Sequence, residues 1–159
     1  MAVVNGGHLV AKALKAEGVK YIFTLCGGPI LPIYEGCVSE GIGVIDFRHE
    51  QAAAFAAQAW AKVTGNPGVV VATAGPGVTN IVTAVASAFK DAVPLVAIGG
   101  RSRFTQWDMG PPQDLDHLAH MRPITKWARS VLETQRLPEY VSMAFRQASG
   151  PRPGPVFLE

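Results

Sequence analysis

Hydrophobic and polar positions along the chain follow two periods, one typical of helices and one typical of buried strands. Apolar residues at helical spacing predict helices over 7–17, 30–38, 51–63, 78–89, 115–120 and 137–148. Short apolar runs between them predict strands over 21–25, 44–47, 68–73, 94–98, 124–131 and 155–158. Gly18 and Gly41 are placed to end the first two helices. A long polar loop is predicted from residue 99 to about residue 113.

The order of these segments indicates an α/β protein. The run GVVVAT at 68–73 is nearly continuous valine, which is typical of a strand buried on both faces of a parallel sheet. Helices that alternate with such strands cover both sides of the sheet. We therefore expect one flavodoxin-like three-layer α/β/α domain with a parallel sheet over residues 1–159. Ligands bind such sheets at the carboxyl ends of the strands, so the loops there are the candidates for a site.

Composition narrows the classes of function. Hydrophobic residues make up 48% of the 159 residues and charged residues only 16%, below the roughly 25% that is usual. This low charge predicts a large protein interface. The scattered basic residues and net charge of +2 argue against nucleic-acid binding, and no apolar run reaches the length of a membrane span. Two cysteines, Cys26 and Cys37, are too few for a disulfide framework and favour a reducing, cytoplasmic location.

A glycine loop, TAGPGVTN at 73–80, joins the valine-rich strand to the next helix. Its backbone N–H groups could receive an anion at the start of that helix. It is not the dinucleotide fingerprint, because that pattern needs Gly or Ala where Asn80 stands. Two interpretations remain open, a tight turn that needs small residues and a loop that lets a flat ligand lie against the backbone.

Glu50 is the sharpest candidate for chemistry, because it stands where a strand meets an alanine-rich helix. A carboxylate at a helix N-terminus is also stabilised by the helix dipole alone, which is the plainer interpretation. Arg48 is placed to pair with Asp46 or with Glu50. His117 and His120 share a helix face at a spacing of three, but no third ligand lies nearby in the sequence, so no metal site is predicted.

Five stretches of the chain, in this order, resemble one family: GGPILPIYEGC, RHEQAAAFAAQAWAKVTG, ATAGPGVTNIVTAVASAF, QDLDHLAHMRPITKWARSV and the ending GPVFLE. They are similar to the N-terminal pyrimidine-binding domain of thiamine-diphosphate enzymes, in the group of acetolactate synthases, acetolactate synthase-like proteins and benzaldehyde lyases. The resemblance covers essentially the whole chain. Each motif alone is weak, but the RHE and GPGVTN pieces together are specific.

The resemblance implies roles for particular residues. In the family, the Glu that matches Glu50 hydrogen-bonds N1′ of the aminopyrimidine ring and so activates the cofactor, and the Gln that matches Gln113 reaches the reacting centre. By the same matching, the cofactor-binding residues are Pro29, Glu50, Thr73, Pro76, Gly77 and Asn80, and the residues beside the substrate are Cys26, Gly28 and Pro29. The alanines at 52–54 would leave room for a cofactor and a facing subunit.

The same resemblance implies what the chain lacks. Family members bind the diphosphate and Mg²⁺ through a second domain marked by Gly-Asp-Gly, which this sequence does not contain. We therefore expect a domain without the central and diphosphate-binding domains, inactive alone, that shares thiamine diphosphate with a partner domain in a homodimer or homotetramer. Its substrate would be a small carbonyl compound, such as a 2-oxoacid, an aldehyde or a 2-hydroxyketone. The sequence reads LCGG at 25–28 where acetolactate synthases tend to read Tyr-Pro-Gly-Gly, which leaves decarboxylation, ligation and cleavage open.

Three alternatives to a carboligase or lyase half-site remain. The domain could be a non-catalytic dimerisation module of the same fold, or a separate subunit of a 2-oxoacid decarboxylase. An ordinary nucleotide-binding domain ranks last, because Asn80 breaks the fingerprint and no acidic residue is placed to hold a ribose.

Overall fold

The structure is a computed structural model that describes residues 5–159, and residues 1–4 lie outside the description. Six parallel strands form one sheet in the order β2-β1-β3-β4-β6-β5. The strands are β1 (Tyr21–Thr24), β2 (Gly43–Asp46), β3 (Gly68–Ala72), β4 (Leu95–Gly99), β5 (Trp127–Arg129) and β6 (Pro155–Leu158). Every residue of β3, β4 and β6 is buried, as expected for central strands covered on both faces.

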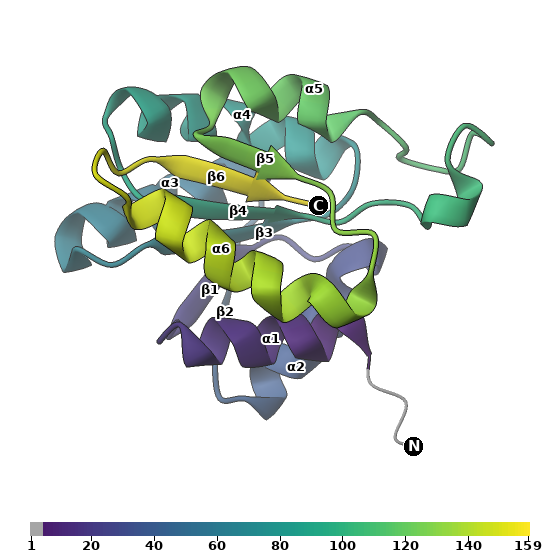
Figure 1. The fold of residues 1–159 in the computed structure, drawn as a ribbon, viewed down its shortest axis with the longest axis horizontal. Coiled ribbons are helices and arrows are strands. Elements are labelled where there is room, and N and C mark those ends of the chain that lie inside the picture. Colours follow the sequence, from purple (N-terminus) through teal and green to yellow (C-terminus); the bar gives the residue numbers. More distant parts are fainter. Residues whose placement is uncertain (1–4) are drawn as a thin grey trace.

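Helices cover both faces of this sheet, which confirms the three-layer α/β/α fold (Figure 1). One apolar core lies under α1 (Gly6–Ala16), α2 (Leu31–Ser39) and α6 (Leu137–Ser149). A second core lies under α3 (Glu50–Thr64), α4 (Pro76–Lys90) and the short α5 (His117–Met121). No helix of residues 5–159 combines the length and the apolarity that crossing a bilayer requires.

The predicted order of helices and strands is confirmed, but one strand is much shorter than expected. The prediction of a strand over 124–131 is wrong at its start, because Arg122–Ile124 forms a 3₁₀ turn and β5 begins at Trp127. Pro123 has no N–H to give to a sheet, and the Thr125 hydroxyl donates back to the Met121 carbonyl. The predicted polar loop after β4 is confirmed as largely irregular, with one 3₁₀ turn at Phe104–Gln106.

The alanine-rich helix α3 lies directly on β3. A Cβ atom added to Gly68 would stand 2.0 Å from the Ala57 carbonyl oxygen, so only glycine permits this approach. Ala53 and Ala54 are fully buried in the core, whereas Ala52 is exposed. The expectation that all three leave room for a cofactor is therefore wrong for Ala53 and Ala54, because their side of the helix faces the sheet. The close packing holds the N-terminus of α3, where Glu50 lies, at the edge of the sheet.

The strand order reverses between β1 and β3. The chain moves from β1 outward to β2, then returns to β3 and proceeds outward the other way to β4. In such sheets the crevice for a ligand forms at this reversal, beyond the carboxyl ends of the two strands. The loops after β1, β2 and β3 all emerge at that edge, since all strands are parallel. They carry nearly all the residues that the sequence nominated.

Candidate functional site

Glu50 is the first residue of α3, and its side chain is almost completely buried, with 7% of the residue exposed. His49 caps the helix through its Nδ1 atom, which accepts from the Gln51 N–H at 3.2 Å. Within residues 5–159, Asn80 is the one side chain that donates to the Glu50 carboxylate, through Nδ2 to Oε2 at 2.9 Å. The helix dipole stabilises the negative charge at this position, and the amide of Asn80 adds a directed hydrogen bond.

The glycine loop after β3 packs closely beside this carboxylate. A Cβ atom on Gly77 would stand 2.7 Å from Thr73 Cγ2 and 3.5 Å from Glu50 Oε1. A Cβ atom on Gly27, in the loop after β1, would stand 2.3 Å from Thr73 Oγ1. Thr73 Oγ1 is buried without a hydrogen-bond partner among the described residues. The structure thus brings Glu50, Thr73, Gly77 and Asn80 together.

Gln113 reaches the same loop through its backbone. A Cβ atom on Gly75 would stand 2.8 Å from the Gln113 carbonyl oxygen, so the two segments touch. Gly75 has φ +58° and Gln113 has φ +64°, so both turn the chain sharply where they meet. The Gln113 side chain is exposed, and so is Pro76 at the start of α4.

The three residues predicted beside the substrate lie on the loop after β1. Cys26 carries a free, exposed thiol, and Gly28 has open space where a side chain would be. Pro29 lies against Gly100, the residue after β4, where a Cβ atom would stand 2.7 Å from Pro29 Cβ. These residues therefore share the carboxyl edge of the sheet with Glu50.

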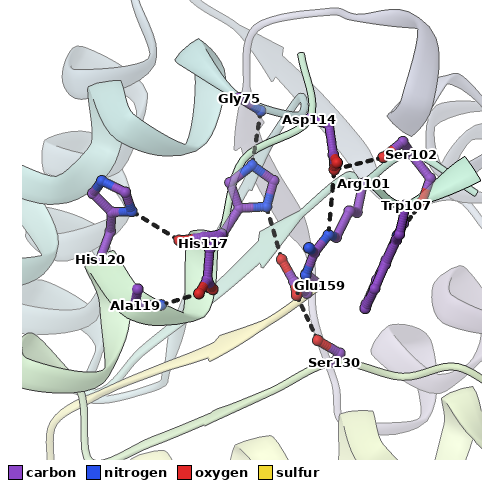
Figure 2. A network of polar contacts seen from close by, with 11 residues as sticks. Gly75, Arg101, Ser102, Trp107, Asp114, His117, Ala119, His120, Ser130 and Glu159 are labelled. Atoms are coloured by element: carbon purple, nitrogen blue, oxygen red, sulfur yellow. Dashed lines mark hydrogen bonds and ion pairs between the residues drawn. The ribbon is translucent and has the colours of Figure 1, made fainter. Parts of the chain in front are cut away.

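Three side chains singled out in the sequence have no contact with the Glu50 carboxylate. Arg48 is exposed and pairs with Asp46, with Nη1 and Oδ2 2.8 Å apart, which decides between its two possible partners. His117 and His120 do not converge: His120 Nδ1 contacts the Asp116 carbonyl oxygen at 2.8 Å, while the His117 ring points the other way, into the protein (Figure 2). Across residues 5–159 there is no group of three or more His, Cys, Asp and Glu residues arranged to hold a metal ion.

A buried polar network lies next to the glycine loop, and sequence reasoning missed it (Figure 2). His117 joins the Gly75 N–H to the carboxylate of Glu159, the residue that follows β6. Glu159 also accepts from Ser130 and from Arg101. Arg101 stacks on Trp107, with the guanidinium carbon 3.6 Å from the ring centroid. The sequence signal was a charged residue after a buried strand, at the same edge as the candidate site.

Two ionisable groups near this edge have shifted pKa values. Burial would raise the pKa of Glu159, but hydrogen bonds from His117, Ser130 and Arg101 outweigh it and hold the pKa below its ordinary value. Burial raises the pKa of Tyr34 to about 12. The Thr24 hydroxyl donates to the Val71 carbonyl, so Tyr34 must donate to Thr24 in their 2.5 Å contact. Tyr34 is therefore a neutral hydrogen-bond donor that links α2 to β1.

Comparison with known proteins gives a consistent result. Residues 4–120 match the family described as "Thiamine pyrophosphate enzyme, N-terminal TPP binding domain". The chain is 42% identical over 156 residues to a probable acetolactate synthase of Mycobacterium bovis, covering 98% of this chain and 28% of that protein. It is 42% identical over 158 residues to 2-hydroxyacyl-CoA lyase 2 of Homo sapiens, covering 99% and 25%. It is 40% identical over 156 residues to a probable acetolactate synthase large subunit of Methanocaldococcus jannaschii, covering 98% and 26%. The chain spans about a quarter of the length of these relatives.

Proposed function

Because the chain belongs to the thiamine pyrophosphate enzyme family and matches the N-terminal TPP binding domain of that family, we propose that it forms the pyrimidine-binding half of a thiamine diphosphate site. The complete enzyme would be a carboligase or lyase that acts on 2-oxoacids, aldehydes or 2-hydroxyketones. Relatives are named for acetolactate synthase and for 2-hydroxyacyl-CoA lyase, so both carbon–carbon bond formation and cleavage occur among similar proteins.

The observation that carries this proposal is the buried carboxylate of Glu50. Asn80 engages Oε2, whereas Oε1 lies beside Gly77 and receives no hydrogen bond from a side chain of residues 5–159. A carboxylate held in this way can share a proton with a ring nitrogen, which is the proton-transfer task that the proposal assigns to it. Thiamine diphosphate, when bound, supplies the chemistry at a carbonyl carbon for which amino-acid side chains are poorly suited.

The neighbouring residues fit a flat ring. Thr73 has an unsatisfied buried hydroxyl, and Gly77 keeps the wall beside Glu50 free of a side chain. Thr73, Pro76 and Gly77 would line the pyrimidine. Gln113 and Cys26 would lie toward the substrate, and so would Gly28 and Pro29, since all four are on loops at this edge and have exposed side chains or open space.

The remaining half of the site would come from a partner domain, in the same or another chain, that binds the diphosphate and Mg²⁺. The relatives are about four times longer than this chain, which leaves room for such a domain. The outer face of α3 supports docking close to Glu50, because His49, Gln51, Ala52 and Phe55 line a shallow depression there. We propose that this face packs against the partner domain in a homodimer or homotetramer.

We also propose a cytoplasmic location, because both cysteines are free thiols, as expected in a reducing compartment.

The test is Glu50→Gln in the complete assembly, which keeps the size of the side chain but removes its proton-accepting carboxylate. Thiamine-diphosphate-dependent turnover should fall by roughly 10² or more, the scale of an acid–base contribution, while size-exclusion chromatography shows intact assembly. Glu35→Gln on the exposed surface of α2 is the matched control and should leave turnover unchanged. Unchanged turnover in Glu50→Gln would instead identify a non-catalytic dimerisation module.

A second measurement tests the half-site itself. Calorimetric titration of thiamine diphosphate and Mg²⁺ into this chain alone should show no tight binding, and addition of the diphosphate-binding domain should restore it. Tight Mg²⁺-dependent binding by the chain alone would show that both halves of the site are present in it.

A further inference from the structure

His117 connects the glycine loop to the sheet through both of its ring nitrogens. The residue is fully buried, and its Nε2 atom lies 2.8 Å from the backbone nitrogen of Gly75. An N–H group can only donate, so Nε2 must be the acceptor and carry no proton. The Nδ1 atom, 2.7 Å from Glu159 Oε2, therefore carries the proton and donates to the carboxylate. The two contacts together select one neutral tautomer (Figure 2).

Gly75 sets the start of the helix that carries the partners of Glu50. It has φ +58° and ψ −111° and precedes the first residue of α4, with no side chain capping that helix. Its carbonyl accepts from the Thr79 N–H, so it begins the hydrogen-bonded path of α4. Gly77 and Asn80 stand on the first turns of the same helix and meet the Glu50 carboxylate. A shift of the Gly75 turn would therefore move the partners of Glu50.

The other end of the imidazole is anchored firmly. Glu159 follows β6, a central strand between β4 and β5, and its side chain is only 1% exposed. Its second oxygen, Oε1, is held by Arg101 and Ser130. Arg101 Nε also lies 3.7 Å from the carboxylate of Asp114, next to Gln113. Charge-assisted hydrogen bonds from Arg101 and Ser130 thus fix the carboxylate to which His117 donates.

We propose that His117 is a positioning residue for the cofactor: as a neutral imidazole protonated at Nδ1, it holds the Gly75 turn and thereby sets Gly77 and Asn80 against Glu50. This inference rests on the proposed function, which assigns the Glu50 carboxylate to the cofactor. His117 itself makes no hydrogen bond to the Glu50 carboxylate, since its two ring nitrogens contact Gly75 and Glu159. Its effect is carried through the backbone of residues 75–80.

Two amide substitutions separate this role from that of an ordinary buried side chain. The amide of Gln overlays the Nε2 end of an imidazole, so His117→Gln keeps an acceptor for the Gly75 N–H. The amide of Asn overlays the Nδ1 end, so His117→Asn keeps a donor for Glu159 but leaves the Gly75 N–H unpaired. Each variant loses one arm of the bridge. A purely structural role predicts similar losses in both, whereas positioning through Gly75 predicts a loss mainly in His117→Asn.

The first test needs no cofactor and uses the chain itself. Nitrogen-15 NMR of the wild-type imidazole should show a protonated Nδ1 and an unprotonated Nε2. Hydrogen exchange of the Gly75 amide should accelerate by roughly tenfold or more in His117→Asn and remain near wild type in His117→Gln. A protonated Nε2 in the wild type would overturn the inference even if neither variant folds. Equal Gly75 exchange in both variants would overturn it as well.

The second test measures, in the complete assembly, the cofactor concentration that gives half-maximal turnover. This concentration should rise by roughly tenfold in His117→Asn and much less in His117→Gln, because only the former leaves the Gly75 amide unpaired. His120→Asn, at an exposed position one turn further on, is the matched control and should change nothing. If the half-maximal cofactor concentration is unchanged in His117→Asn while Glu50→Gln is inactive, the positioning role of His117 is refuted and the proposed function stands. Unchanged turnover in Glu50→Gln would refute the proposed function instead.

Discussion

Replacing Gly68 by alanine tests how closely α3 packs on the sheet. The added Cβ would stand 2.0 Å from the carbonyl oxygen of Ala57 and 2.7 Å from its carbonyl carbon, both backbone atoms of α3. Neither atom can rotate away, so the helix itself must move by about 1.5 Å to reach an ordinary contact distance. That movement would loosen the fully buried contacts of Ala53 and Ala54 on the same helix face. It would also displace Glu50 at the start of the helix.

Overpacking of a close-packed core typically costs 1–3 kcal/mol, and a clash between two backbones belongs at the upper end. We therefore expect Gly68→Ala to lower the free energy of unfolding by about 3 kcal/mol. For a chain of this size that loss corresponds to a fall in melting temperature of roughly 6–12 °C. Cofactor-dependent turnover of the complete assembly should fall as well, because the carboxylate of Glu50 moves with α3.

Urea unfolding followed by circular dichroism measures the change in the free energy of unfolding. The comparison is valid if wild type and variant share the same dependence of this free energy on urea concentration. Gly28→Ala is the matched control for stability, because nothing lies within 4 Å of the added Cβ and its backbone is not in the left-handed region. It should be neutral or stabilise by a few tenths of a kcal/mol, since alanine restricts the unfolded chain. If Gly68→Ala were as stable as Gly28→Ala, α3 would not lie on β3 as closely as described.

Two further predictions concern the charged groups at the carboxyl edge. Glu159→Gln should destabilise the protein by about 3 kcal/mol at pH 7, because it removes the charge that pairs with the largely buried Arg101 and leaves only the longer contact to Asp114. The pKa of Glu159 is depressed in the folded state, so its stabilisation is present above the unfolded value near 4.5 and is lost as the pH falls further. The difference between wild type and variant should therefore shrink below about pH 4.5 in urea titrations; a constant difference would contradict the depressed pKa. Asn80→Ala should cost about 1–2 kcal/mol by removing the donor to Glu50, and a double-mutant cycle with Glu50→Ala, which removes the acceptor, should show coupling of at least about 0.5 kcal/mol; additive losses would mean that this hydrogen bond contributes nothing.

The candidate site could be predicted from sequence only where local pattern identifies a residue. Glu50 was accessible to sequence reasoning, because it lies at the junction of a strand and an alanine-rich helix. The contact between Glu50 and Asn80 joins residues 30 positions apart, and no local pattern encodes it. The contacts of His117 were missed for the same reason, since Gly75 and Glu159 each lie 42 residues away. The spacing of His117 and His120 was weighed only as a metal pair, for which the sequence offered no third ligand.

The sequence by itself determined the class of fold and the succession of elements. Buried parallel strands and amphipathic helices each have a characteristic pattern of apolar residues over a short segment, so they can be recognised from neighbouring residues alone. Strand order was decided only by tertiary structure, which inserts β6 between β4 and β5 and thereby brings Glu159 beside His117. The 3₁₀ turn that shortens β5 and the close approach of α3 to Gly68 were decided there as well. Such features depend on contacts between residues far apart in the chain, whose free energy is gained only when the layers pack together.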